Sequence, residues 1–512
     1  MTDVTRQLAR FVVASRWTEL PREVRHEAKR ALLNWLGCAF GGCNDPAVDT
    51  ALAGLREFAG PPQATVLGRR ERLDILNAAL VNAIGSNVLD FDDTHLRTVI
   101  HPTVPVAAAI TALAGLREFA GPPQATVLGR RERLDILNAA LVNAIGSNLL
   151  DFDDTHLRTV IHPTVPVAAA ITALAEHVPV TGAQFLHAFV LGVEAECRIG
   201  LAVSPEHYNA GWHITSTCGV FGAAAACGKL LKLDEQQTTW ALGIAATQAA
   251  GLTAVHGSMS KCFNMGHAAR NGLTAALLAQ KGFTSSERGI EAPRGFAHVL
   301  SPRCDLNAVV DGLGHRWELL ENACKPYPCG IVGHPIIDGC LELRSAHGIA
   351  PDTIARIELR VHPLVMELMG NPVPRTGLEA KLSVHHCAAA AFVFGEVGVK
   401  EFTDACANDP AVVALRARVV PTVDAAMAAD AADVVVALKD GKKQHAFVPH
   451  ALGSLERPLT DADLENKFRA LAAWGFSTCN AYDVIELLWS FDNINDAAAL
   501  ARTTVPSAAT AV

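Results

Sequence analysis

The densest group of ionisable side chains in the 512-residue chain is Asp151-Phe-Asp-Asp-Thr-His156, which is followed by His162-Pro163. Neighbouring carboxylates repel each other, so one of them acquires a raised pKa suited to proton transfer, and an imidazole at a helix start can meet a substrate. The same residues also fit a network in which Asp and Thr oxygens cap helix N-termini. A metal-dependent hydrolase is a further alternative, but we expect no metal because the spacing matches no recognised ligand pattern.

Three more polar motifs interrupt apolar sequence further along the chain: Gly211-Trp-His213-Ile-Thr-Ser-Thr217, Gly257-Ser-Met-Ser-Lys261 and Lys325-Pro-Tyr-Pro-Cys-Gly330. The first offers hydroxyl and backbone N–H groups at a helix start, where an anion can bind. The lysine of the second can hold a carboxylate by charge, and the prolines of the third fix a loop that presents Lys325 and Tyr327. Each motif also has a purely structural explanation: a helix cap, a solvated surface lysine and a rigid turn between domains.

Residues 50–110 are repeated at 111–171, and the two copies differ at one of 61 positions, where Val88 corresponds to Leu149. Architectural repeats have periods of about 20–50 residues and diverge, so the pattern indicates a recent duplication. Removing one unit of 61 from 512 residues leaves 451. Because the other candidate residues lie downstream, we expect copy 2 to form the site. The displaced copy 1 equivalents of its candidate residues are Asp90, Thr94 and His101.

Composition restricts the class of protein. Half of the residues are hydrophobic and the net charge is −9, which predicts a globular protein and argues against nucleic acid as a partner. The longest small-apolar run, 218–231, is shorter than the roughly 20 residues of a membrane span, and the N-terminus resembles no signal peptide. Thirteen cysteines without a Cys-x-x-Cys pair predict free thiols, Cys38 and Cys43 included. We therefore expect a soluble cytoplasmic protein with no membrane partner.

The elements that must position these motifs are mainly helices, because apolar residues recur at three- and four-residue spacing up to about residue 285. Helices are expected over 21–37, 72–87, 183–200, 219–231, 235–250 and 266–281, with Gly282 as the C′ residue of the last. A fused helix is expected over 103–120, at the junction of the two copies.

The texture of the sequence changes after residue 285. Strands are expected at 353–361 and 433–438, the second ending in a turn, and Thr460 with Asp463 predicts a helix start. The predicted fold class is therefore mainly α. A large all-helical domain comprises 1–285 and 460–512 and includes the duplication, and a smaller α+β lid domain comprises 286–459.

Taken together and in this order, the four polar motifs resemble those of the MmgE/PrpD family, and the resemblance runs from about residue 8 to 475, apart from the extra unit. Members include 2-methylcitrate dehydratase, cis-aconitate decarboxylase and iminodisuccinate epimerase. The resemblance implies a helical domain completed by C-terminal helices, an α+β lid and a homodimer. It also implies lyase or isomerase chemistry on a small di- or tricarboxylate, with no cofactor.

The resemblance further implies which residues form the site. The catalytic set is Asp151, Thr155, His162, His213, Lys261 and Lys325, and the expected substrate-binding set is Ser216, Thr217, Ser260, His267, Arg270 and Tyr327. Gly330 stands where some decarboxylases carry a histidine, and the Thr155–His162 spacing is one residue longer. We therefore expect a hydro-lyase acting on a tricarboxylate such as 2-methylcitrate. A decarboxylase, an epimerase and a binding-only protein impaired by the duplication are the alternatives.

Overall fold

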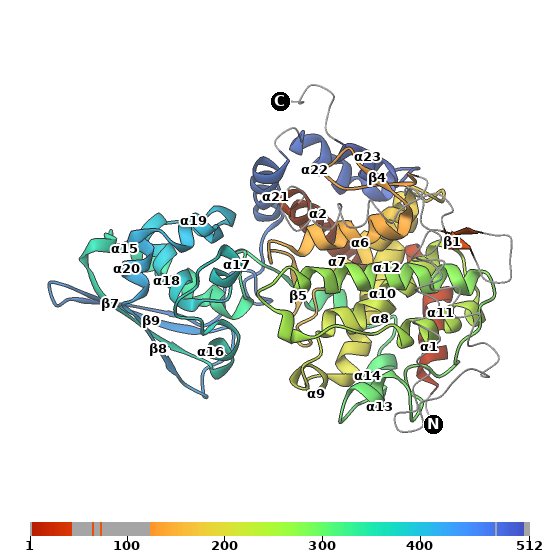
Figure 1. Cartoon of the computed structure of the whole chain (residues 1–512), viewed down its shortest axis with the longest axis horizontal. Coiled ribbons are helices and arrows are strands. Elements are labelled where there is room, and N and C mark those ends of the chain that lie inside the picture. Colours follow the sequence, from red (N-terminus) through yellow and green to blue (C-terminus); the bar gives the residue numbers. More distant parts are fainter. Residues whose placement is uncertain (1–2, 43–63, 66–71, 74–122, 477–478, 506–512) are drawn as a thin grey trace.

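A computed structural model describes residues 3–42, 64–65, 72–73, 123–476 and 479–505 (Figure 1). It has two lobes, a larger helical one that includes both ends of the described chain and a smaller one built around a sheet. The fused helix expected over 103–120, Cys43 and the copy 1 residues Asp90, Thr94 and His101 lie outside the described residues.

The larger lobe is helical, as expected. Its main helices are α1 (Val4–Ala14), α2 (Arg22–Gly42), α6 (Ile136–Asn148), α7 (Thr164–Ala175), α8 (Gly182–Val203), α10 (Ile214–Leu230), α11 (Glu235–Thr247), α12 (Ser260–Gln280), α21 (Asp461–Gly475) and α22 (Ala481–Trp489). The short helices α9 (Glu206–Asn209), α13 (Phe296–Leu300), α14 (Asn307–Val310) and α23 (Ala499–Thr503) complete it. The C-terminal helix α21 packs on the N-terminal α2, so the end of the chain lies against its beginning.

Helix α10 is the centre of the helical lobe, because it packs against both α8 and α12. Its residues from Ile214 to Gly228 are all buried, as expected for a helix of small apolar residues with no solvent face. Glycines allow the close approach: a Cβ at Gly272 of α12 would lie 2.4 Å from the Ala223 Cβ, and one at Gly222 would lie 2.9 Å from the Gly192 carbonyl oxygen. The small residues therefore set how closely the helices that carry the site can approach.

Two helices begin earlier than predicted. Helix α10 begins at Ile214 instead of 219, and the hydroxyls of its polar first turn find partners: Thr217 donates to the Ile214 carbonyl and Ser216 to the Asn264 carbonyl. Helix α12 begins at Ser260 instead of 266, which places Lys261 in its first turn. It ends at Gln280, and Gly282 follows with φ +82°, as expected for the C′ residue.

The helix expected over 72–87 is wrong at its start, because Arg72–Leu73 form strand β2, paired antiparallel with β1 (Ala64–Thr65). The same sequence in copy 2 forms β4 (Arg133–Leu134), paired with β3 (Ala125–Thr126), and then α6. The reason is the aspartate between the two elements: Asp135 accepts hydrogen bonds from the N–H groups of Leu137 and Asn138 and so fixes the helix start.

The smaller lobe has a four-stranded sheet in the order β10-β9-β7-β8, with β7 and β8 parallel and the other pairs antiparallel. Its strands are β7 (Ile354–Val361), β8 (Val419–Val423), β9 (Ala432–Leu438) and β10 (Lys443–Val448). Its helices are α15 (His334–His347), α16 (Pro363–Met369), α17 (Gly377–Ala380), α18 (Val384–Phe394), α19 (Asp404–Ala407) and α20 (Pro410–Arg416). Both predicted strands are therefore present, and a turn with Gly441 at φ +86° joins β9 to β10.

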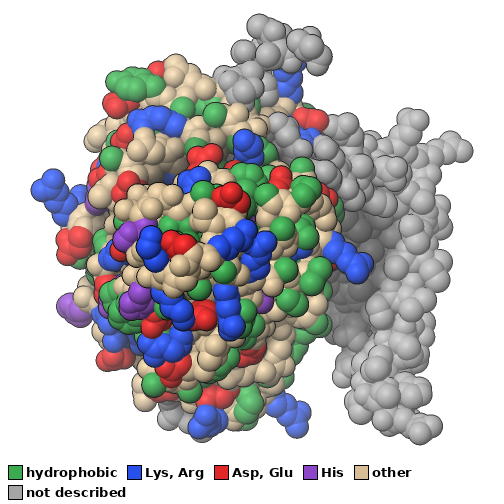
Figure 2. Space-filling model, turned by 90° about the vertical axis from the view of Figure 1, so that its left-hand side faces the viewer, with side chains coloured by type: hydrophobic (Ala, Val, Ile, Leu, Met, Phe, Trp, Pro, Cys, Tyr) green, Lys and Arg blue, Asp and Glu red, His purple; other side chains and the backbone are tan. Residues whose placement is uncertain are grey.

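Two separate hydrophobic clusters underlie the lobes. The larger draws on residues 4–324 and 459–501, and the smaller on 327–446. Residues at the start of the expected lid contribute to the larger cluster through Ile290, Phe296 and Leu319. The domain limits and the movement of a lid stay predictions. Figure 2 shows acidic and basic side chains mixed over the end of the molecule that the smaller lobe forms.

The described helices are relevant to the expectations about a membrane span and about the Cys38 thiol. Among the described residues, no helix combines the length and apolar character that a membrane crossing requires. Cys38 is buried in α2, and burial raises the pKa of its thiol to about 12.

Candidate active site

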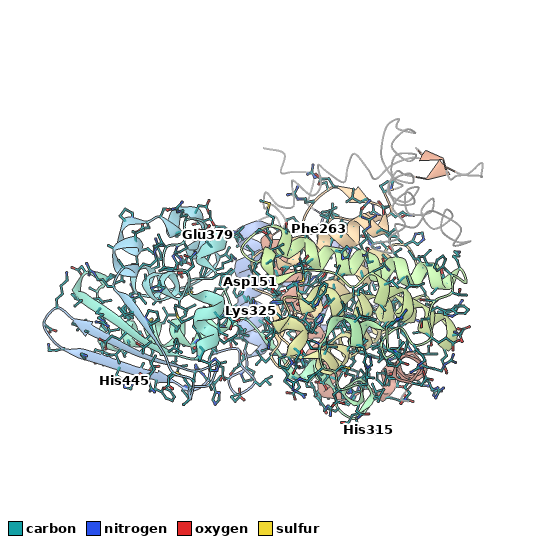
Figure 3. All side chains as sticks on the ribbon, turned by 60° about the horizontal axis from the view of Figure 1, so that its bottom comes forward. Asp151, Phe263, His315, Lys325, Glu379 and His445 are labelled. Atoms are coloured by element: carbon teal, nitrogen blue, oxygen red, sulfur yellow. The ribbon has the colours of Figure 1, made fainter. Side chains whose placement is uncertain are left out.

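A cavity of about 650 Å³ lies between the two lobes. The helical lobe lines it with residues from 148–162, 204–213 and 253–262, and the smaller lobe with residues from 330–332, 364–369 and 378–382. Asp151 and Lys325 lie where the lobes meet (Figure 3). All six predicted catalytic residues line this cavity: Asp151, Thr155, His162, His213, Lys261 and Lys325.

Asp151 is the centre of the charged groups in the cavity. Its Oδ1 accepts from Lys261 Nζ at 2.6 Å and from Lys325 Nζ at 2.8 Å. Burial raises the pKa of this carboxyl, but the two ammonium groups outweigh burial and hold the pKa well below its ordinary value. Burial likewise lowers the pKa of Lys261, and the Asp151 carboxylate reverses this shift. Asp151 and Lys261 are therefore both charged at neutral pH.

Three elements bring these charges together. Lys261 lies in the first turn of α12, and Lys325 follows strand β6 (Asn322–Cys324), which pairs with β5 (Asp154–His156). Lys467 of α21 supports the arrangement from behind, since its Nζ donates to the carbonyls of Phe152 at 2.5 Å and Lys325 at 2.7 Å. The C-terminal helices thus hold two backbone segments of the site.

His162 lies two residues before α7, as the helix-start prediction requires. Its Nδ1 lies 2.9 Å from the Asp154 carbonyl oxygen, 3.3 Å from Asp153 Oδ1 and 3.5 Å from Thr155 Oγ1. A carbonyl oxygen can only accept, so Nδ1 carries a proton and Nε2 is the nitrogen left to exchange one. Burial raises the pKa of Asp153, but His162 outweighs it and the pKa lies below its ordinary value.

His213 precedes α10 and is buried. Burial, together with the neighbouring His256 and Lys261, holds its pKa well below the ordinary value, so the ring is neutral at neutral pH. Its Nδ1 lies 3.4 Å from Asn264 Nδ2, and its ring meets that of His256 edge-on at 5.2 Å. Burial also lowers the pKa of His256, to about 4. The cavity therefore presents neutral imidazoles beside fixed ammonium groups.

The expected raised carboxyl pKa belongs to Asp154, where burial and the neighbouring Asp153 raise it. Its carboxylate accepts from the Thr164 hydroxyl and from Asn322 Nδ2, so it joins α7 to strand β6. Asp154 is absent from the cavity lining, and its role is structural. Both partners are side-chain donors and α7 has no side-chain cap hydrogen bond, so this carboxylate does not cap a helix as the structural alternative expected.

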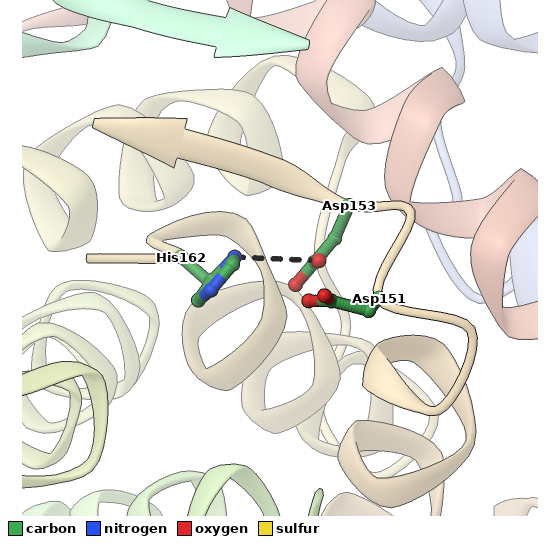
Figure 4. A group of neighbouring side chains, drawn as sticks. All are labelled: Asp151, Asp153 and His162. Carbon is green, nitrogen blue, oxygen red and sulfur yellow. Dashed lines mark ion pairs between the residues drawn. The ribbon is translucent and has the colours of Figure 1, made fainter. Parts of the chain in front are cut away.

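Asp151, Asp153 and His162 form a group whose ligand atoms lie within 4.8 Å of one another, close enough to hold a metal ion (Figure 4). However, Asp151 Oδ1 already accepts from Lys261 and Lys325. A divalent ion at this point would be repelled by both ammonium groups. Because of these two lysines, the site fits a carboxylate substrate better than a metal ion.

The six predicted substrate-binding residues are not among those that line the cavity. Ser216 Oγ donates to the Asn264 carbonyl, Thr217 Oγ1 contacts His207 Nε2 at 2.7 Å, His267 contacts Asn271, and Tyr327 Oη donates to Asp338 at 2.6 Å. Ser260 is exposed at the start of α12, and Arg270 lies further along the same helix. Their role in substrate binding therefore stays a prediction.

Five residues that line the cavity are not among the predicted site residues: Arg158, Tyr208, His256, Met369 and Lys381. Arg158 lies between His156 and His162, so the motif that contains Asp151 could have indicated it. Lys381 and Met369 come from the smaller lobe, far from every motif in sequence, and no local pattern predicts that they reach the cavity.

Comparison with known proteins finds the same family that the four polar motifs resemble. Residues 6–118 and 115–308 each match the MmgE/PrpD N-terminal domain, and 327–492 match the MmgE/PrpD C-terminal domain. The first match covers copy 1 of the repeat, and the second covers copy 2 from residue 115 onward.

Three relatives span most of the chain. A cis-aconitate decarboxylase of Homo sapiens is 30% identical over 400 residues (73% of this chain, 81% of that protein) and one of Mus musculus is 28% identical over 411 residues (75% and 82%). The cis-aconitate decarboxylase-like protein oryM of Aspergillus oryzae is 25% identical over 495 residues (92% and 91%).

Proposed function

The chain belongs to the MmgE/PrpD family, and on that premise we propose that it is a lyase that acts on a small tricarboxylate by acid–base catalysis. The observation that carries the proposal is the cavity in which Lys261 and Lys325 share one aspartate while three imidazoles, those of His162, His213 and His256, line the same space. Lysine ammonium groups attract the carboxylates of a substrate and stabilise the enolate-like charge that develops when a proton is removed beside a carboxylate.

The proton transfers fall to the imidazoles. His162 donates from Nδ1 to the Asp154 carbonyl, so its Nε2 can accept the substrate proton. His213 is neutral and can exchange a hydrogen bond or a proton with the leaving group. Asp151 holds both lysines in place, because its Oδ1 accepts a hydrogen bond from each. Thr155, 3.5 Å from His162 Nδ1, helps to hold that ring.

Within this class we favour elimination of water, as from 2-methylcitrate. Gly330 lines the cavity, and a Cβ at this position would lie 2.8 Å from Met369 Sδ. A histidine, which some decarboxylases of the family carry here, therefore cannot be placed unless Met369 moves. This departure at Gly330 makes the decarboxylase reading less favoured than a dehydratase.

Decarboxylation of cis-aconitate is the second candidate, because the relatives of human, mouse and Aspergillus bear that name. The two reactions have different products, since only decarboxylation releases carbon dioxide. Incubation with 2-methylcitrate, citrate and cis-aconitate, followed by enoate absorbance and by carbon dioxide release, separates them.

The catalytic assignment is tested with Lys261→Ala and His162→Ala in the single-copy, 451-residue chain. We expect each variant to lose about 10²–10⁴-fold in turnover, the usual contribution of a positioned acid, base or charge. Full turnover by both variants contradicts the assignment. No turnover of any of the three acids by the unmodified chain favours the binding-only alternative.

A further inference from the structure

Lys381 is a third buried lysine of the cavity, and the proposed mechanism leaves it unused. It follows α17 in the smaller lobe, lines the cavity and is 6% exposed. Its Nζ donates to the carbonyl oxygen of Leu150, directly before Asp151 in the helical lobe. Its own carbonyl accepts from the Gly330 N–H at 3.1 Å, at the end of the loop that begins with Lys325. The residue thus contacts both segments that present the charged groups.

Lys381 differs from the other two lysines in its charge balance. Asp151 Oδ1 is shared by Lys261 and Lys325, whereas the polar partner of the Lys381 ammonium among the described residues is a neutral carbonyl. The Phe402 ring, 5.9 Å away, is a weak further contact. A buried ammonium without a carboxylate is costly, and an anion in the cavity would relieve the cost.

We propose that Lys381 binds a carboxylate of the substrate and so makes the smaller lobe part of the tricarboxylate-binding site. The proposal rests on the proposed function, because it takes the ligand to be a small polycarboxylate. Two carboxylates of such a ligand can meet Lys261 and Lys325 on the helical side, and the third meets Lys381. Binding would then hold the two lobes together through charge.

The direct test measures the affinity of tricarballylate, a saturated tricarboxylate that cannot undergo the reaction, by calorimetry. Lys381→Met keeps the apolar stem and removes the charge, and we expect affinity to fall by about 10- to 150-fold, the worth of a hydrogen bond to a charged group. Lys381→Gln retains a neutral donor for Leu150. If the lysine only supports that carbonyl, Gln restores affinity; if it binds the ligand by charge, Gln stays close to Met.

Lys229 supplies a matched control. Its Nζ donates to the carbonyls of Val12, Val13 and Ser15, burial lowers its pKa to about 8, and it is absent from the cavity lining. Lys229→Met therefore removes a carbonyl-bonded lysine of similar pKa elsewhere, and we expect tricarballylate affinity to stay unchanged. An equal loss of affinity in both variants overturns the proposal.

A second measurement needs no variant to fold. Burial lowers the pKa of Lys381 to about 8, and the groups that face it are Asp151, Cys329, Lys261 and Lys325. At about pH 8.5 Lys381 has therefore lost its proton in most molecules, and a bound carboxylate favours its protonation. We expect uptake of most of one proton per tricarballylate at about pH 8.5 and little at about pH 7. Binding without proton uptake at the higher pH overturns the proposal.

These outcomes separate this proposal from the proposed function. If tricarballylate binds with Lys381-dependent affinity but no acid is turned over, the lyase proposal fails and the role of Lys381 stands. If turnover is found and Lys381→Met binds tricarballylate as the parent chain does, the lyase proposal stands and the role of Lys381 fails.

Discussion

Replacing Asp151 with asparagine tests whether one carboxylate holds the two site lysines in place. Asp151 has φ +52°, a conformation that asparagine tolerates and alanine does not, so Asp151→Asn removes the charge without straining the backbone. The variant leaves the ammonium groups of Lys261 and Lys325 buried side by side, with no carboxylate at 2.6 and 2.8 Å.

The magnitude follows from these distances. At an effective dielectric constant of about 20, unit charges at the two distances attract by roughly 6 kcal/mol for each pair. Desolvation of the ions offsets part of this attraction, and removal of one partner from a buried pair costs about 3–5 kcal/mol. We expect Asp151→Asn to lower the free energy of unfolding by that amount at neutral pH, as measured by urea denaturation.

Two further variants show whether the loss comes from the lysines. Asp311→Asn is the matched control, because Asp311 pairs with Arg316 at 2.9 Å but is 71% exposed, and such a pair is worth less than about 1 kcal/mol. Adding Lys261→Met to Asp151→Asn removes one unpaired ammonium, so the double variant should lose less than the sum of the single losses. Additive losses, or a loss from Asp151→Asn below about 1 kcal/mol, refute the reasoning.

The pH dependence has a definite sign. Because folding lowers the pKa of Asp151 below its ordinary 3.8, its contribution to stability is present above the unfolded pKa and disappears as pH falls through the folded pKa. The difference in unfolding free energy between the parent chain and Asp151→Asn should therefore stay constant from neutral pH down to about pH 5 and narrow below about pH 4. A difference that shrinks already near neutral pH contradicts the low pKa.

Two other predictions concern packing and the duplication. Gly182→Ala should lower the free energy of unfolding by more than about 2 kcal/mol, because the new Cβ would lie 1.6 Å from the Phe491 carbonyl oxygen. In Gly228→Ala the new Cβ meets only a flexible side chain at 3.3 Å, so this variant should be neutral or stabilising by up to about 1 kcal/mol. Urea denaturation measures both, and equal effects contradict the observed packing. Deleting 50–110 or 111–171 gives two chains of 451 residues that differ only in Leu149 or Val88, and Leu149 lines the cavity. Both chains should turn over the same acid. Their kcat/KM values should differ by no more than about 10–200-fold, because that is the effect of one methylene group in an apolar pocket. If the chain with Val88 is inactive, the residue at this position does more than provide an apolar surface.

Much of the fold could be predicted from sequence, because local signals set it. Apolar periodicity indicates the helices, and Thr460 with Asp463 indicates the start of α21. In the structure Thr460 and Asp463 form a capping box. The starts of α10 and α12 could not be predicted in the same way. The first turn of α10 is polar yet buried, and that of α12 combines Lys261 with the exposed Ser260 and Phe263, so neither shows the apolar spacing that indicates a helix.

The candidate site divides in the same manner. Asp151, His162, His213, Lys261 and Lys325 could be named because residue types that move protons or bind carboxylates stand in motifs of a known family. Sequence could not show which way the expected substrate-binding side chains face, because that depends on contacts with residues far away along the chain. Ser216 and Tyr327, for example, bond to a backbone carbonyl and to Asp338 instead of lining the cavity.

The sequence by itself therefore determined the helical character, the duplication, the family and the candidate residues for the chemistry, because each follows from local composition, spacing or order. Only the tertiary structure decided which charges meet. Lys261, Lys325 and Lys381 are separated by tens of residues, yet two share Asp151 and the third reaches the carbonyl of Leu150 from the other lobe. Such meetings depend on how helices and a sheet pack over long separations, and no local pattern encodes them.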